Sequence, residues 1–294
     1  MADHVLILAG ITLLAAVVNG ALGYGFSSLT VPIALLFLTN RVLNPALVLV
    51  EVVLNAYVLW VNRQALGAIA RRMLPIVAGL LPGVAIGTLV VASVHPDWLK
   101  LATFALLLPL ILLQAAGYRR PIRSERSIAV PFGTGVGLLY SLTTISGPPL
   151  ALMLNNQGLA KHEFRAALGF VRLAEATFTA SAYASVGLYT RESLTLAPVM
   201  LPGLLIGVPF GAWLIRQVDA ETFRRVCMSF DAWVVGFGIS TLLRRLQIVD
   251  GAEAYSVLVA VIVIDVVLLY RFFATPRSSR LAMVPAVARG GQGQ

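Results

Sequence analysis

Two short segments of this chain place small, hydroxyl-bearing and aromatic residues inside otherwise apolar stretches. Hydroxyl groups can donate hydrogen bonds to the oxygens of an anion. Glycine lets a ligand approach the backbone closely, and the start of a helix offers unpaired N–H groups and a partial positive charge to an anion. The residues expected to bind a small anion in this way are Gly23, Tyr24, Gly25, Phe26, Ser27, Ser28, Thr143, Thr144, Ser146 and Gly147.

Ionisable and amide side chains also fall within apolar stretches, where a charge is costly and points to function. Arg172 could attract the anion directly. Glu51 or Glu175 could carry a coupling proton, because burial favours the neutral form of a carboxyl group. The polar cavity around the anion is expected to contain Asn19, Glu51, Asn55 and Glu175.

Each of these patterns also has a purely structural interpretation. The hydroxyl groups could cap short helices, and the glycines could permit close helix packing. Arg172 and Glu175 are three residues apart on one predicted helix, so they could form a structural pair. Asp231 and Asp265 are interpreted as structural, and Asp265 could serve an oligomer contact.

The composition defines the class of protein that must position these residues. The chain has 294 residues, of which 59% are hydrophobic and only 12% charged, and its mean hydropathy is +0.87. Soluble domains carry about 25% charged residues. We therefore expect an all-α polytopic membrane protein, and no nucleic-acid binding despite the net charge of +9. Apolar stretches lie near residues 5–38, 44–62, 74–93, 99–117, 128–154, 166–188, 196–215, 226–243 and 256–272.

The distribution of basic residues indicates that stretch 128–154 does not cross the membrane. If every stretch crossed once, ten Lys and Arg would lie on one side and eleven on the other, which gives no orientation. If 128–154 turns back as a hairpin, five lie on one side (Arg41, Lys100, Arg191, Arg244 and Arg245), and the opposite side, expected to be cytoplasmic, holds 16. These 16 are Arg63, Arg71, Arg72, Arg119, Arg120, Arg123, Arg126, Lys161, Arg165, Arg216, Arg224, Arg225, Arg271, Arg277, Arg280 and Arg289.

The two halves of the chain resemble each other. The pattern Leu-Pro-Gly-x-x-Ile-Gly occurs at 81–87 and again at 201–207, and two further short matches lie at similar offsets. Each half would then be one broken, re-entrant hairpin followed by three crossings, so the second copy is inverted relative to the first. The predicted divisions are a first repeat at 1–118, a second at 119–250, an extra transmembrane helix at 251–273 and a tail at 274–294. The N-terminus is expected outside and the C-terminal tail in the cytoplasm.

The residues around the two breaks resemble a known family. Asn19-Gly20-Ala21-Leu22-Gly23-Tyr24-Gly25-Phe26 followed by Pro32, Ser146-Gly147-Pro148-Pro149, and the paired Leu-Pro-Gly-x-x-Ile-Gly segments are similar to motifs of the TauE/SafE membrane permeases. The resemblance covers about residues 5–272. It implies a multi-pass protein of the bacterial cytoplasmic (inner) membrane that exports or takes up sulfur-containing anions such as sulfite, sulfoacetate or isethionate.

The leading hypothesis is therefore a secondary transporter for a small sulfur-containing anion, working by alternating access and coupled to protons or to the membrane potential. The alternatives are a passive anion channel and a permease for another small carboxylate or inorganic anion. An intramembrane enzyme and a scaffold protein are less favoured, because no catalytic set of residues is apparent and two polar breaks suit a binding site. We expect no cofactor and no metal, and a homodimer is one option for the assembly.

Overall fold

Helices make up the described part of the chain. The computed structural model describes residues 2–116, 125–155, 159, 161–215, 217 and 220–274, and these residues contain no strand. The α-helices are α1 (Ala2–Leu22), α2 (Phe26–Ala34), α3 (Asn40–Val61), α4 (Leu66–Ser93), α5 (Pro96–Ala115), α6 (Glu125–Thr143), α7 (Gly147–Asn155), α8 (Lys161–Ser185), α9 (Arg191–Leu214), α10 (Ala220–Arg245) and α11 (Ser256–Ala274). Two short 3-10 helices, η1 (Arg63–Ala65) and η2 (Gly251–Tyr255), precede α4 and α11.

Among the residues that the structure describes, six helical segments are long and apolar enough to cross a membrane. They comprise all or most of α3, α4, α5, α9, α10 and α11, and each coincides with an apolar stretch of the sequence. In a bilayer a helix satisfies its own backbone hydrogen bonds, which is why long apolar segments adopt this form. The expected all-α polytopic membrane class is confirmed.

The expected crossing at 166–188 corresponds to α8, which differs from these six segments in composition. Its 25 residues would extend about 38 Å at 1.5 Å per residue, enough to cross a bilayer. However, α8 is not among the apolar segments, because polar side chains occupy its middle. Arg172, Glu175 and Thr179 are nonetheless buried. The polar face of α8 therefore lies against protein.

Both expected interruptions of the apolar stretches separate two helices. The chain leaves α1 after Leu22 and enters α2 at Phe26, and it leaves α6 after Thr143 and enters α7 at Gly147. The helices that follow the breaks have nine residues each, or about 14 Å, which is less than half of a hydrocarbon core of about 30 Å. Neither α2 nor α7 can cross a bilayer alone.

The first helix of each broken stretch packs on a helix from the other half of the chain. Extensive contacts join α1 to α9 and α6 to α4. Glycines permit this approach: a Cβ placed on Gly83 of α4 would lie 2.0 Å from the carbonyl oxygen of Thr134, and one on Gly207 of α9 would lie 2.7 Å from that of Leu13. The two Leu-Pro-Gly-x-x-Ile-Gly segments thus lie in equivalent contacts.

The buried apolar side chains form clusters that interleave the two halves. One cluster joins α1, α2, α3 and α5 to α9 and α10, and a second joins α4 to α6, α7 and α8. Each cluster therefore combines a broken stretch from one half with a long helix from the other. Between the two clusters, α3 lies against α8.

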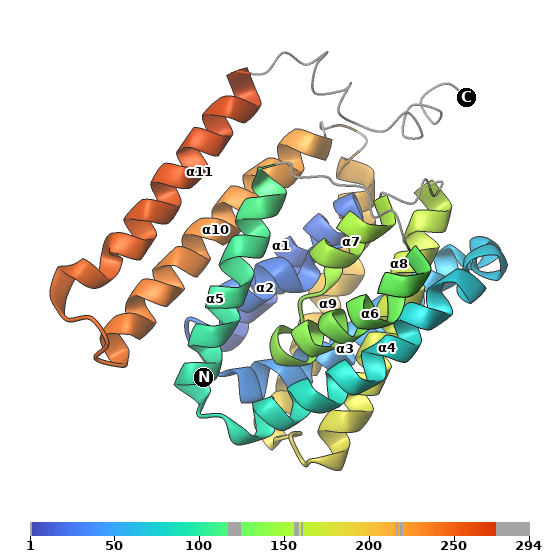
Figure 1. The fold of residues 1–294 in the computed structure, drawn as a ribbon, viewed down its shortest axis with the longest axis horizontal. Helices are drawn as coiled ribbons and strands as arrows, with labels where there is room; N and C mark the ends of the chain where they lie inside the picture. Colours follow the sequence, from blue (N-terminus) through green and yellow to red (C-terminus); the bar gives the residue numbers. More distant parts are fainter. Residues whose placement is uncertain are drawn as a thin grey trace.

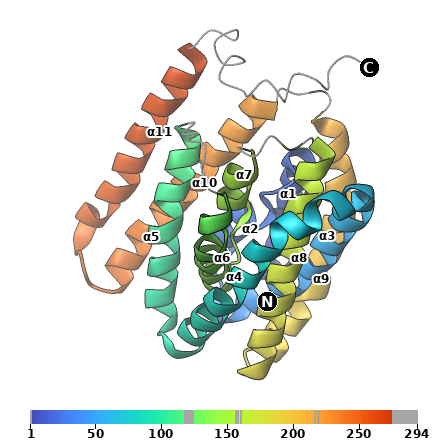
Figure 2. The ribbon, with the colours of Figure 1, turned by 45° about the vertical axis from the view of Figure 1, so that its right-hand side comes forward.

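The last helix, α11, lies at one edge of the bundle beside α10 (Figures 1 and 2). Its Asp265 accepts hydrogen bonds from Arg225 at 2.8 Å, Ser229 at 3.2 Å and the indole of Trp233 at 3.1 Å, all on α10. This carboxylate joins α11 to α10 within one chain, which agrees with the structural interpretation of Asp265. The predicted tail lies outside the described residues from 275 onward.

Candidate functional site

The first break is made by two glycines in a conformation that other residues rarely adopt. Gly23 has a φ of 84° and Gly25 a φ of 108°, both in the left-handed region that favours glycine. The N–H of Gly23 donates to the carbonyl of Asn19 at 2.7 Å and closes the end of α1. The chain then enters α2, whose first-turn N–H groups have no partner within the helix. Phe26 and Ser27 stand at this start and are buried.

The second break is held by its own threonines. Thr144 has a φ of 56°, which is uncommon for a residue with a branched side chain. The hydroxyl of Thr143 accepts a hydrogen bond from the N–H of Ile145 at 3.1 Å. Pro148 and Pro149 occupy the first turn of α7, where proline is well suited but supplies no N–H donor. This helix start therefore offers fewer backbone donors to an anion than the sequence hypothesis assumed, and its side-chain hydroxyls gain importance.

The two breaks lie against each other. A Cβ placed on Gly147 would lie 3.1 Å from the Cβ of Tyr24. Tyr24 and Leu150 belong to the same buried apolar cluster, so the contact is part of the packed interior. The site residues predicted from two distant parts of the sequence are thereby brought together.

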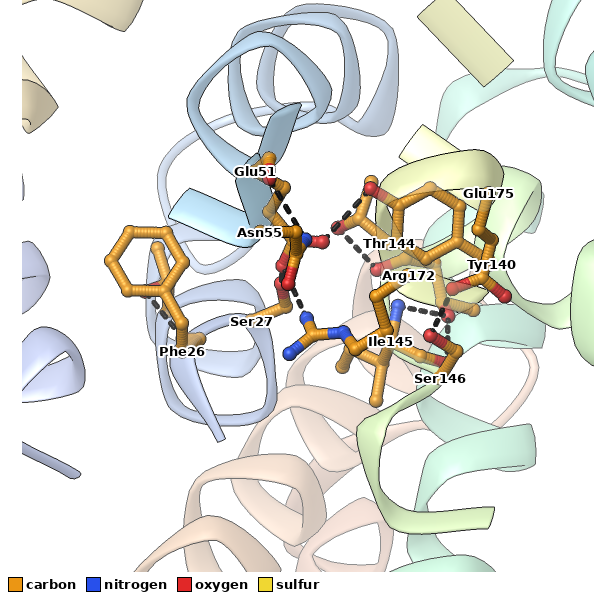
Figure 3. A network of polar contacts seen from close by, with 12 residues as sticks. Phe26, Ser27, Glu51, Asn55, Tyr140, Thr144, Ile145, Ser146, Arg172 and Glu175 are labelled. Atoms are coloured by element: carbon orange, nitrogen blue, oxygen red, sulfur yellow. Dashed lines mark hydrogen bonds and ion pairs between the residues drawn. The ribbon is translucent and has the colours of Figure 1, made fainter. Parts of the chain in front are cut away.

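The carboxylate of Glu51, on α3, is the centre of a buried polar network (Figure 3). Its Oε1 accepts hydrogen bonds from the hydroxyl of Ser27 and from Nη2 of Arg172 at 2.9 Å. Its Oε2 accepts one from the hydroxyl of Tyr140 at 2.8 Å. All four side chains are at most 2% exposed. Donors from α2, α6 and α8 therefore converge on one carboxylate.

At the second break, too, a serine donates a hydrogen bond to a buried glutamate. Ser146, at the start of α7, donates to Oε2 of Glu175 on α8 at 2.5 Å. Ser27 at the start of α2 donates to Glu51 on α3 in the same manner. Each half of the chain thus joins the serine at its own break to a glutamate on its own next helix. By these contacts Glu175 is the counterpart of Glu51.

Arg172 forms its ion pair across helices and not along its own helix. The sequence placed Arg172 and Glu175 within pairing distance on α8, but the guanidinium reaches Glu51 on α3 at 2.9 Å. The structural pair suggested from the spacing within α8 is therefore wrong in its partner. Spacing along a helix identifies neighbours on its surface, and a long arginine side chain can reach a carboxylate on a facing helix instead.

The remaining predicted residues have different surroundings. Asn55 donates to the backbone carbonyl of Glu51 at 2.8 Å, one turn back along α3. Asn19 is buried at the end of α1, and Ser28 is only partly buried. The ring of Phe26 is directed away from the carboxylates (Figure 3). These residues surround the network rather than taking part in its side-chain hydrogen bonds.

Tyr140 is a member of the network that the sequence hypothesis did not include. It lies on α6, three and four residues before Thr143 and Thr144. Residues at this spacing share one face of a helix. Its position one helical turn before the polar break was therefore the feature of the sequence that could have identified Tyr140 as a site residue.

Three buried polar atoms of α8 have no hydrogen-bond partner among the described residues. They are Nε of Arg172, Oε1 of Glu175 and Oγ1 of Thr179. All three belong to α8 at positions that share one face. Buried polar atoms are almost always partnered, so unpartnered donors and acceptors beside a buried ion pair fit a site that receives a ligand. No group of His, Cys, Asp and Glu among the described residues could hold a metal ion.

Comparison with known proteins gives one match. The family model described as "Sulfite exporter TauE/SafE" matches residues 8–238, which include both breaks and every residue of the polar network. Comparisons with curated proteins and with solved structures give no match. The match covers most of the 294 residues and agrees with the resemblance seen around the breaks. The chain therefore belongs to the TauE/SafE sulfite exporter family and is a multi-pass membrane transporter.

Proposed function

We propose that this chain is a secondary transporter that moves a small sulfur-containing anion across the bacterial cytoplasmic membrane by alternating access. The substrate would be sulfite or a sulfonate such as sulfoacetate or isethionate. The family supports the substrate class. The observation that carries the proposal is the contact between the two helix breaks, at Gly147 and Tyr24, beside the buried guanidinium of Arg172.

The anion would bind through hydroxyl groups and one guanidinium. Ser27, Thr143, Thr144 and Ser146 are buried at the two breaks, and Arg172 supplies the positive charge. The first-turn N–H groups of α2 would add backbone donors. Gly23, Gly25 and Gly147 would keep the backbone accessible, with Tyr24, Phe26 and Ser28 around them.

The two halves would form inverted repeats, each with a re-entrant hairpin, and the N-terminus would lie outside. The exchange of partners supports this: α1 of the first half packs on α9 of the second, and α6 of the second packs on α4 of the first. The equivalent hydrogen bonds from Ser27 to Glu51 and from Ser146 to Glu175 support it further. The moving units of alternating access would then be the two interleaved apolar clusters, each a hairpin of one half with a long helix of the other.

The proposal is tested with the purified full chain in lipid vesicles. We expect saturable uptake of sulfite, isethionate or sulfoacetate. Ser146→Ala should lower that uptake about tenfold or more, because a hydrogen bond to a charged group contributes about 1.5–3 kcal/mol. Gly147→Leu should abolish it, because the added side chain would collide with Tyr24.

The matched control is Ser181→Ala on α8, where the exposed hydroxyl donates only to the carbonyl of Thr177 within the helix. It should transport as the wild type does. A folded Ser146→Ala protein with wild-type uptake would contradict the assignment of the site. Failure of the wild type to take up any of the three anions would contradict the function, and unitary currents would show a channel.

A further inference from the structure

The Glu51 carboxylate is surrounded by hydrogen-bond donors of the kind that bind anions; these donors are called the cradle below. Two hydroxyls and a guanidinium, from Ser27, Tyr140 and Arg172, donate to its two oxygens. Arginine and hydroxyl donors of this kind recognise oxyanions in general, whether the oxyanion is a side chain or a free ligand. The cradle draws its donors from both halves of the chain, as the proposed transport site does.

The guanidinium of Arg172 has a hydrogen-bond donor that Glu51 does not use. Glu51 contacts Nη2 through a single oxygen, whereas Nε is buried and has no partner among the described residues. In arginine the N–H of Nε and one N–H of Nη2 point the same way. An anion with two or three oxygens could bridge both groups, which is the stronger, bidentate arrangement.

We propose that Glu51 is a built-in competitor of the transported anion, and that a proton on Glu51 releases Arg172, Ser27 and Tyr140 to that anion. This inference rests on the proposed function and adds its coupling: about one proton would be taken up with each anion. The step is a proton transfer from water to a carboxylate oxygen of Glu51. No bond to the anion is formed or broken.

The charges of the cluster explain why the two anions exclude each other. From α8, Arg172 and Glu175 face Glu51, and from α6 Tyr140 does. Among the described residues, α2, α4, α5 and α9 bring no titratable side chain into the network. Arg172 is therefore its cation, and in a low-dielectric interior an ionised Glu51 and a bound anion beside it repel each other strongly.

Glu175 is the matched comparison within the same site. It is also fully buried and also accepts from the serine at a break, but the ion pair of Arg172 is made with Glu51. Protonation of Glu175 would not release a donor from Arg172. The two carboxylates can therefore be separated by experiment.

The test measures isethionate binding to the purified full chain by calorimetry as a function of pH. A sulfonate keeps its charge across the mildly acidic to mildly alkaline range, whereas sulfite itself titrates there. We expect the wild-type Kd to rise about tenfold for each pH unit once Glu51 is ionised in the free protein. Glu51→Gln should bind more tightly than the wild type at alkaline pH and should lose this dependence, whereas Glu175→Gln should keep it.

A second measurement uses the unaltered chain and so does not depend on the folding of a variant. Binding heats in buffers of different ionisation enthalpy should show uptake of about one proton with each isethionate. A wild-type Kd that is constant with pH, no proton uptake, or a dependence lost in Glu175→Gln and retained in Glu51→Gln would overturn the inference. Binding without pH dependence would leave the transport function standing, whereas absence of binding and uptake of every sulfur-containing anion would remove that function too.

Discussion

At the scale of single residues, Arg172 and Glu51 neutralise each other where neither reaches water. Their side chains are 2% and 0% exposed and lie 2.9 Å apart. Removing two charges from water costs several kcal/mol per ion, and their attraction offsets this only while both are present. Replacing one partner alone should therefore destabilise the fold more than the double replacement would suggest, because the remaining charge is buried and unpaired.

Arg172→Gln should lower the free energy of unfolding by about 3–5 kcal/mol, because it leaves the Glu51 carboxylate buried and unpaired. The double variant Glu51→Gln with Arg172→Gln should lose clearly less than the sum of the two single changes. Denaturant unfolding in detergent micelles measures both. Arg71→Gln, at an exposed arginine of α4, is the control and should change stability by less than about 0.5 kcal/mol. Strict additivity of the two buried changes would contradict the ion pair.

Tyr140→Phe removes one donor from Oε2 of Glu51 and leaves the ring in place. The expected loss in the free energy of unfolding is about 1–3 kcal/mol, because a buried carboxylate oxygen loses its partner. The matched control is Tyr270→Phe on α11, where the side chain is 74% exposed. Its stability should not change. Equal stability of Tyr140→Phe and the wild type would show that the hydroxyl does not hold Glu51.

At the scale of helices, the long glycine-lined contacts of α4 with α6 and of α9 with α1 position the two breaks. In a membrane the hydrophobic effect contributes little between helices, so close packing of small residues has to supply the association. Gly79, Gly83 and Gly87 all face α6 along one side of α4. A larger side chain at any of these glycines would push α6, and with it the second broken stretch, away from the first.

Gly83→Ala should lower the free energy of unfolding by about 1–3 kcal/mol, because its Cβ would lie 2.0 Å from the carbonyl oxygen of Thr134 and force the helices apart. Gly10→Ala on α1 is the control, since a Cβ there meets nothing within 4 Å. That change should be neutral or stabilising by up to about 1 kcal/mol, because alanine favours a helix over glycine. Thermal unfolding in micelles compares the two, and equal effects would contradict the packing argument.

The sequence predicted the helices and both breaks well, because these depend on local features. Long apolar runs specify the crossings, and the clusters around Gly23 and Ser146 interrupt them. The choice of helix partners was not predictable, since small residues occur on most of the helices. The sequence analysis also assigned Arg172 to Glu175 on the same helix and did not include Tyr140. Both errors concern contacts between α8, α6 and α3 that only the packed bundle defines.

At the scale of the whole molecule, the two halves contribute similar but unequal parts to one site. Each supplies a break, a serine and a glutamate, but Arg172 and Tyr140 have no counterpart in the network from the first half. An inverted repeat with identical halves would hold its ligand equally from both sides. This asymmetry places the guanidinium of the network on α8, opposite the Glu51 carboxylate on α3.

In the proposed topology the broken stretch α6–α7 turns back within the membrane, so that its tip meets the tip of α1–α2. Between His95 and Ser185 the chain then crosses the membrane twice, through α5 and α8, and both residues lie on one face. Figures 1 and 2 show the α4–α5 and α8–α9 connections at the same end of the bundle. The opposite face would hold Gln64.

The most direct test is the side from which an impermeant thiol reagent labels single cysteines introduced into intact vesicles, in a Cys227→Ala background that removes the chain's one native cysteine. His95→Cys, Ser185→Cys and Gln64→Cys each place a thiol at an exposed position. We predict that the first two react from one side and the third from the other. Labelling of Ser185→Cys on the Gln64 side would mean that α6–α7 crosses the membrane, and would contradict the account.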